Sequence, residues 1–396
     1  MQLTLETLMQ RDIAPREAER AAVWDGLWSH RSPGRIAVNV TPSEARVEQA
    51  RAVIETVDLP ASDMPPQWRE ALLENLAHWH AWRQTQGDGF PSLNVPRFLH
   101  GHSQGICDLF GARVAPQPDG IFFVHPLPPN PDHVATLETR PLKTSVYWGA
   151  VEYLRCARAA TGGLIPFRGP IMTGPFDTAN YLLGSTVLLE WVYTEPDALH
   201  ALLERITAVI GDMVLALRAA AGGSLNAHHL ACARGGPDFA SECRSIISRE
   251  TYETYDAPYL RRLGERLGPY AIHSCGAWER TVPSARRDPN LRAMNGQVKE
   301  NDLADLCAQA AGEITLSIQP SANLHERYLF ASREEFFRYV LERVPADQPL
   351  ELSIGEDEIP QWNRICASCN HTEHCPPRIP AIEGLEFERT GTNRRQ

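Results

Sequence analysis

The segment His273-Ser274-Cys275-Gly276 carries the residues of this chain best suited to binding a metal ion. In a β-strand, side chains two positions apart point to the same face, so His273 and Cys275 could converge on one ion, and imidazole nitrogen and thiolate sulfur are both zinc ligands. Gly276 allows a sharp turn or a close approach to a ligand. The alternative is a core histidine beside an inert buried thiol, because two residues alone match no established zinc spacing.

A short apolar run, Tyr270-Ala271-Ile272, precedes this segment and predicts the strand that must position it. From about residue 144 onward, helical segments with apolar residues three and four apart alternate with short apolar or β-branched runs. Repeated strand-then-helix units imply parallel strands with right-handed crossovers. Together with the strand expected over 35–40, they favour a closed (β/α)8 TIM barrel of the α/β class over an open doubly wound sheet.

The boundaries of these elements place several polar groups at one end of the barrel. The predicted strands cover 35–40, 164–172, 224–230, 270–274, 288–294, 314–318 and 349–354, and the predicted helices cover 16–28, 67–85, 144–161, 178–183, 197–221, 249–267, 301–311 and 333–343. Residues 41–135 are rich in proline and tryptophan and form a less regular N-terminal region. Barrel enzymes carry their chemistry at the carboxyl ends of the strands, where His273 and Cys275 fall.

Composition limits the classes of function. The chain has 396 residues, 43% of them apolar, and a formal net charge of −11. It has no lysine-rich tract, which disfavours a nucleic-acid or anionic-membrane partner. The N-terminus lacks the basic and apolar regions of a signal peptide, and no stretch approaches 18 apolar residues, so a cytoplasmic location is expected. Nine cysteines in a reducing compartment favour thiols and metal ligands over disulfides.

From roughly residue 16 to 360 the chain resembles the uroporphyrinogen decarboxylase superfamily, which contains porphyrinogen decarboxylases and zinc- and corrinoid-dependent methyltransferases. The stretches that carry the resemblance are Glu19-Arg20 through Val38, Gly169-Pro170-Ile171-Met172-Thr173-Gly174-Pro175-Phe176, Asn180-Tyr181-Leu182-Leu183-Gly184, and Tyr259-Leu260-Arg261-Arg262 ahead of His273-Ser274-Cys275-Gly276. The resemblance implies one barrel domain over residues 1–360, followed by a cysteine- and histidine-rich tail over 361–396.

The two branches of this superfamily differ in their ligands. The decarboxylases carry an arginine-rich segment near the N-terminus, and nothing in residues 1–60 matches it. The methyltransferase branch has H-x-C after the fifth strand and a third zinc ligand, usually cysteine, after the eighth. Glu356 stands where that cysteine is expected, so the resemblance implies a zinc site of His273, Cys275 and Glu356 with one open position. Glu356 as a solvated acidic side chain is the alternative, with Asp357, Glu358 or Cys366 as the ligand instead.

The tail offers a possible second metal site. Its C-x2-C-x5-C spacing, with two interleaved histidines, suits a structural zinc or an iron-sulfur cluster. A tail with free thiols, or one that supplies Cys366 to the main site, is the alternative. The residues concerned are Cys366, Cys369, His371, His374 and Cys375.

Other polar residues are expected at the barrel mouth. His228 and His229 end the predicted fourth strand and could orient a substrate or transfer a proton, or could simply bond to the next loop. Asn295 and Gln297 are expected beyond the sixth strand and Gln319 beyond the seventh, where each could hydrogen-bond a substrate.

These features predict a zinc-dependent methyltransferase that moves a methyl group between a corrinoid (cobalamin) carrier and a small thiol, methoxy or amine compound. The chain has no Asp-x-His-x-x-Gly cobalamin signature, so a partner protein is expected to supply the corrinoid. A homodimer is a further possibility. The rival hypotheses are a decarboxylase or lyase on the same barrel, acting on a carboxylated substrate, and a non-catalytic corrinoid- or metal-binding protein.

Overall fold

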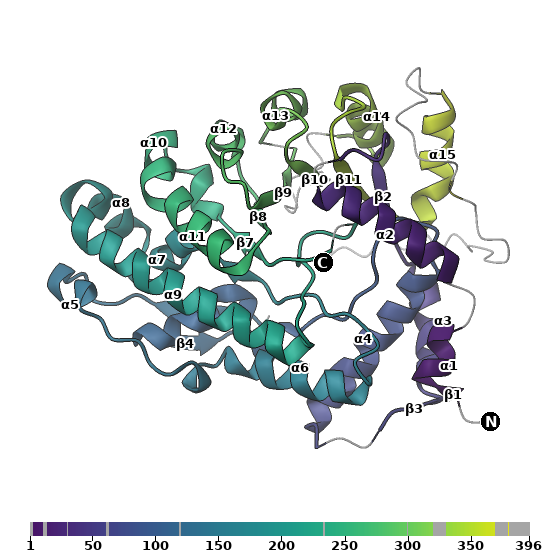
Figure 1. Ribbon diagram of the computed structural model, residues 1–396, viewed down its shortest axis with the longest axis horizontal. Coiled ribbons are helices and arrows are strands. Elements are labelled where there is room, and N and C mark those ends of the chain that lie inside the picture. Colours follow the sequence, from purple (N-terminus) through teal and green to yellow (C-terminus); the bar gives the residue numbers. More distant parts are fainter. Residues whose placement is uncertain are drawn as a thin grey trace.

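Helices surround a central parallel sheet in the computed structural model of the protein (Figure 1). The structure describes residues 3–10, 14–29, 31–60, 63–118, 120–232, 234–298, 300–319, 330–368 and 379. No helix in these ranges is both long and apolar enough to cross a membrane.

The central sheet has seven strands in the order β2-β11-β10-β9-β8-β7-β6, and every ladder in it is parallel. Strands of this kind are covered on both faces, which explains their nearly continuous apolar runs. The strands of this sheet are β2 (Ala37–Thr41), β6 (Met172–Thr173), β7 (Asp238–Ala240), β8 (Tyr270–Ser274), β9 (Leu291–Gln297), β10 (Thr315–Gln319) and β11 (Leu350–Gly355).

An extended segment closes this sheet into a ring. The Asp88 amide donates to the Val38 carbonyl of β2 at 2.6 Å. Farther along, the Leu93 amide donates to Pro166 at 2.9 Å, and the Arg168 amide donates back to Leu93 at 2.8 Å, just ahead of β6. Segment 88–93 thus fills the position between β2 and the strand that ends in β6. The (β/α)8 barrel expected from the sequence is confirmed.

The helices pack outside the strands because their apolar residues recur on one side. They are α1 (Leu5–Gln10), α2 (Ala14–Trp28), α3 (Glu44–Ile54), α4 (Pro66–Gln84), α5 (Pro131–Ala135), α6 (Trp148–Ala160), α7 (Pro175–Leu183), α8 (Ser185–Thr194), α9 (Pro196–Ala221), α10 (Arg249–Thr251), α11 (Ala257–Leu267), α12 (Val282–Ala285), α13 (Leu303–Ala310), α14 (Arg333–Arg343) and α15 (Ile359–Ser368). A π-helical turn, Tyr252–Asp256, joins α10 to α11.

Two small sheets lie apart from the barrel ring. One pairs β1 (Leu3–Thr4) with β3 (Val57–Asp58), and the other pairs β4 (Arg113–Pro116) with β5 (Phe122–His125). The N-terminal region also contains the regular helix α3, capped by the Ser43 hydroxyl, which accepts from the Arg46 amide. The region expected to be irregular is therefore partly ordered into helix.

Several elements differ from the sequence predictions. The fourth strand is β7, and the stretch 224–230 contributes a single bridge between Asn226 and Arg168. Asn295 and Gln297 lie within β9 rather than beyond it, and Gln319 is the last residue of β10. Helix α15 starts at Ile359, so it crosses the boundary placed at residue 360.

Candidate metal centre

Three potential metal ligands meet at the carboxyl ends of the neighbouring strands β7 and β8. They are Glu242, two residues beyond β7, His273 in β8, and Cys275 just after it, and their ligand atoms lie within 4.8 Å of one another. The His273 Nε2 atom is 3.2 Å from Cys275 Sγ and 3.3 Å from Glu242 Oε1. Nitrogen, oxygen and sulfur ligands on a tetrahedral zinc ion lie about 3.4–3.6 Å apart, so these spacings fit zinc.

Asn295 orients the histidine of this group. Its side-chain oxygen lies 2.6 Å from His273 Nδ1, and its amide nitrogen donates to Ser317 Oγ at 2.8 Å. Because Asn295 Oδ1 can only accept, His273 carries its proton on Nδ1 when neutral and presents Nε2 as a lone pair toward Cys275 and Glu242. Such a second hydrogen bond is typical of metal-binding histidines.

Two buried carboxylates hold the loop that carries Glu242. Asp177 in α7 accepts the amides of Glu242 at 2.6 Å and Cys243 at 2.9 Å. Asp256, at the end of the π-helical turn, accepts the Ser241 hydroxyl at 2.6 Å. Burial raises the pKa of Asp177 to about 7 and that of Asp256 to about 6. The hydrogen bonds to Asp177 and Asp256 therefore fix the loop from which Glu242 projects.

Gly276 allows the strand end to pack closely on the same loop. A side chain at this position would place its Cβ 2.4 Å from Ser245 Cβ. Close approach, rather than a positive φ angle, thus explains the glycine.

The electrostatic field at the three ligands favours positive charge. Burial alone would lower the pKa of His273, but its hydrogen bonds with Cys275 and Glu242, together with their charges, raise that pKa to about 10. Burial would raise the pKa of Glu242, yet hydrogen bonding to His273 and to the Cys275 amide lowers it below its ordinary value. A site that holds a proton this firmly also suits a metal cation.

Glu356, the third ligand expected from the sequence, is elsewhere. Its Oε1 accepts from Arg46 Nε at 2.7 Å, and its Oε2 accepts from the Ser43 hydroxyl at 2.9 Å. These hydrogen bonds outweigh burial and lower the pKa of Glu356. The Glu356 carboxylate is thus paired with a buried guanidinium, and the acidic residue that lies beside His273 and Cys275 is Glu242.

The expected histidines adjoin the group without belonging to it. His229 stacks on His273, with ring centroids 3.8 Å apart and an interplanar angle of 7°, and its Nδ1 pairs with Asp238. His228 donates from Nδ1 to the Gly169 carbonyl at 3.1 Å. Burial lowers the pKa of both imidazoles, so both are neutral at neutral pH.

The remaining expected residues lie at different distances from this site. The side chain of Asn295 is hydrogen-bonded to His273, and Gln297 is fully buried in β9. Gln319 pairs in register with Gln297 and belongs neither to the ligand group nor to the cavity lining described below. Cys366 is buried in α15 against the core. Cys369, His371, His374 and Cys375 lie outside the described residues.

A cavity of about 590 Å³ opens beside the ligand group. Its lining includes residues from strands and loops around the ring, among them Asn39, Asn94, Arg168, His229 and Ser353, and the helix residue Trp82. His229 links the two places, since it lines the cavity and stacks on His273. In α4, Trp79 lies in the hydrophobic core, whereas Trp82 lines the cavity.

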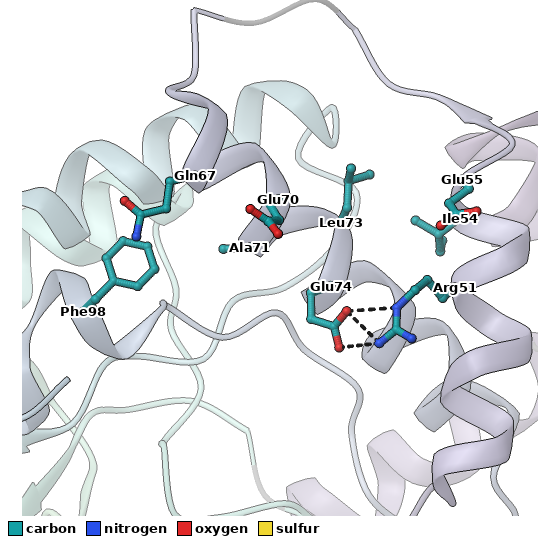
Figure 2. Close-up of a pocket in the computed structure, with 9 residues that line it drawn as sticks. All are labelled: Arg51, Ile54, Glu55, Gln67, Glu70, Ala71, Leu73, Glu74 and Phe98. Atoms are coloured by element: carbon teal, nitrogen blue, oxygen red, sulfur yellow. Dashed lines mark hydrogen bonds and ion pairs between the residues drawn. The ribbon is translucent and has the colours of Figure 1, made fainter. Parts of the chain in front are cut away.

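A second depression, of about 600 Å³, lies between α3 and α4 (Figure 2). Two of its charged groups are paired with each other: Arg51 donates to both oxygens of Glu74 at 2.9 Å. Figure 2 shows Ile54, Leu73 and Phe98 as apolar members of the same lining. None of the described residues that line this depression is a cysteine or a histidine, so it lacks the sulfur and nitrogen ligands found at the ends of β7 and β8.

Sequence reasoning missed Glu242, Arg168 and the buried acids Asp177, Asp238 and Asp256. The signal for Glu242 was the short apolar pair Phe239-Ala240, which follows Gly235-Gly236-Pro237 and reads as a loop because it is so brief. Recognising it as a strand would have put Glu242 at the same edge as Cys275.

Comparison with known proteins agrees with this architecture. A solved structure of a methyltransferase from Methanosarcina mazei superposes with a TM-score of 0.57 at 14% sequence identity, covering 89% of this chain and 93% of that one, and supports the fold. A methylated-thiol–coenzyme M methyltransferase from Methanosarcina mazei is 33% identical over 142 residues, which is 35% of this chain. The match spans only 34% of that relative's length. The profile of the uroporphyrinogen decarboxylase (URO-D) family matches residues 105–342, more than half of the chain. The chain therefore belongs to the uroporphyrinogen decarboxylase family.

Proposed function

We propose that this protein is a zinc-dependent methyltransferase that moves a methyl group between a corrinoid carrier protein and a small thiol, methoxy or amine compound. The observation that carries the proposal is the group of Glu242, His273 and Cys275 at the barrel mouth, beside a cavity of small-molecule size. The similarity to methyltransferases supports it further.

The zinc ligands in this proposal are Glu242 Oε1, His273 Nε2 and Cys275 Sγ. When bound, zinc supplies Lewis acidity, which lowers the pKa of a thiol or polarises another heteroatom in its open coordination position. Asn295 keeps the His273 proton on Nδ1, and Asp177 keeps the Glu242 loop in place.

His229 is the proton carrier of the proposed reaction. Its Nδ1 is engaged by Asp238, which also accepts the His229 amide at 3.0 Å, so the ring is held in one orientation at the cavity wall. A neutral imidazole in this position takes up the proton of an incoming thiol as it ionises and returns it to a leaving group in the reverse direction.

A metal count with a transfer assay tests this proposal. Purified reduced protein is analysed for zinc and then mixed with methylcobalamin and small thiols, and the cobalt spectrum is followed. We expect one zinc that the Cys275→Ala variant loses, together with thiol-dependent loss of the methyl group from cobalt. Cys307→Ala, in the buried face of α13, is the matched control and keeps both. Wild-type protein that takes up no zinc would contradict the proposal, as would decarboxylation without methyl transfer. Any further zinc retained by Cys275→Ala would belong to the tail over 361–396.

A further inference from the structure

Four polar side chains form a row inside the barrel, on the neighbouring strands β8, β9, β10 and β11. They pair in register along the sheet: His273 with Asn295, Asn295 with Ser317, and Ser317 with Glu351. Residues in register on adjacent parallel strands point to the same face of the sheet, and all four of these side chains are buried. This polar row therefore connects a proposed zinc ligand with a buried carboxylate on the last strand of the barrel.

The hydrogen bonds of the polar row all run in one direction, from the imidazole to the carboxylate. Ser317 Oγ donates to Glu351 Oε1 at 2.7 Å and accepts from Asn295 Nδ2 at 2.8 Å. A carboxylate can only accept, so it takes the single hydroxyl proton of Ser317 and leaves the serine lone pairs to the Asn295 amide nitrogen. The Ser317 carbonyl accepts from the same nitrogen at 3.2 Å and favours the same orientation of the amide. Asn295 Oδ1 is thereby turned toward His273 Nδ1.

Backbone amides hold the Glu351 carboxylate in place. Its Oε1 accepts the Ala231 amide at 3.1 Å, and its Oε2 accepts the Cys232 amide at 2.7 Å. These bonds, the bond from Ser317 and the charge of Arg168 oppose the effect of burial, which raises the pKa of Glu351, and they favour the charged form. An aliphatic residue at this position would avoid the cost of burying a charge, so the carboxylate calls for a role beyond packing.

We infer that Glu351 is a positioning residue that acts on His273 through Ser317 and Asn295. This inference rests on the proposed function for the role of His273 as a zinc ligand. By fixing the direction of the polar row, the buried carboxylate keeps the His273 proton on Nδ1 and leaves the Nε2 lone pair for the metal. Its negative charge also polarises each hydrogen bond of the row, which makes the imidazole a more basic ligand.

The Nδ1–H proton of His273 reports on the polar row even without zinc. Its magnetic resonance signal is followed in metal-free protein with isotope-labelled histidine and is assigned by its loss in His273→Gln. Ser317→Ala breaks the row and Glu351→Gln removes its charge, so both should move the signal upfield and speed its exchange with solvent. Thr315→Val is the matched control, because it removes a buried hydroxyl of the same strand that donates to the Leu27 carbonyl. A signal that Ser317→Ala leaves unchanged, or that the control shifts equally, overturns the inference even if Glu351→Gln does not fold.

Zinc affinity provides the second arm of the test. Ser317→Ala and Glu351→Gln should each lower it about threefold to tenfold. Neither should lower it further in the Asn295→Ala background, because that change already interrupts the row beside His273. Losses that simply add would indicate general loosening of the barrel and would overturn the inference. Zinc uptake with an unmoved Nδ1–H signal defeats only this inference, whereas the expected signal changes without zinc uptake defeat only the proposed function.

Discussion

Two strand ends of this barrel carry a buried or half-buried glutamate, and only one of them is arranged to receive a cation. Beyond β7, Glu242 faces an imidazole and a thiol, with no arginine or lysine ion pair on its carboxylate among the described residues. Beyond β11, both oxygens of the Glu356 carboxylate already accept hydrogen bonds, from Arg46 and Ser43. The difference teaches that position at the barrel mouth does not make a carboxylate a metal ligand; the neighbouring side chains decide whether its charge is still available.

The largest effect is expected when the ion pair between Glu356 and Arg46 is broken. Glu356→Gln leaves Arg46 buried without its counter-charge and should lower the free energy of unfolding by about 3–5 kcal/mol. Urea unfolding of the metal-free protein measures this, and the zinc content should not change. Replacing both partners, as Arg46→Met with Glu356→Leu, should recover most of the loss. Loss of zinc in Glu356→Gln would show that the two glutamates had been assigned the wrong way round.

Substitution of Glu242 should affect zinc affinity much more than stability. Glu242→Gln removes one charged ligand of the proposed zinc site, so zinc affinity should fall about 100-fold. The metal-free protein should lose only about 1 kcal/mol of unfolding free energy, because the partly exposed ion pair between Glu242 and His273 is lost. Competition with a chromophoric chelator measures the affinity. Unchanged zinc binding would remove Glu242 from the ligand set.

Asp256, which bonds to the loop that carries Glu242, should make the stability of the protein depend on pH. Burial raises the pKa of Asp256 to about 6, above its unfolded value near 4, so its contribution to stability is complete below about pH 4 and is lost as the pH rises through 6. Asp256→Asn does not titrate and should therefore gain about 2 kcal/mol of stability relative to wild type between pH 5 and pH 8. Urea unfolding of metal-free protein at several pH values checks this; a constant difference would contradict the burial argument.

The smallest effect should come from the residue that orients the histidine. Asn295→Ala leaves all three ligands in place but removes the partner of His273 Nδ1, so zinc affinity should fall about tenfold. Asn39→Ala, a buried asparagine near the other strand end, should leave zinc affinity unchanged. Equal effects of the two changes would point to general loosening of the barrel.

The fold was predictable because the apolar runs of β8, β10 and β11 are long enough to read, and amphipathic helices alternate with most of the strands. β7 was missed because it has only three residues after a glycine-rich turn, and its strand character comes from pairing with β6 and β8. Tertiary pairing, not local preference, makes it a strand.

The candidate site was predictable to the same extent. His273 and Cys275 share one strand end, so spacing alone brought them together. The contact of Glu356 with Arg46 joins residues 310 positions apart, and no local pattern reveals it. Asp177 and Asp256 were equally invisible, since each acts through hydrogen bonds to another segment: Asp177 to the backbone amides of Glu242 and Cys243, and Asp256 to the Ser241 hydroxyl.

The pairing of β7 with β8 brings the proposed metal ligands together from one short part of the chain. Glu242, His273 and Cys275 all belong to one β-α-β unit, residues 238–275, whereas a ligand at Glu356 would have required the last strand of the ring. Contacts between sequence neighbours form earlier than contacts that close long loops. The three proposed ligands can therefore come together before the first and last strands pair to close the barrel. They can also be exchanged as one β-α-β unit, while the remaining strands line the substrate cavity.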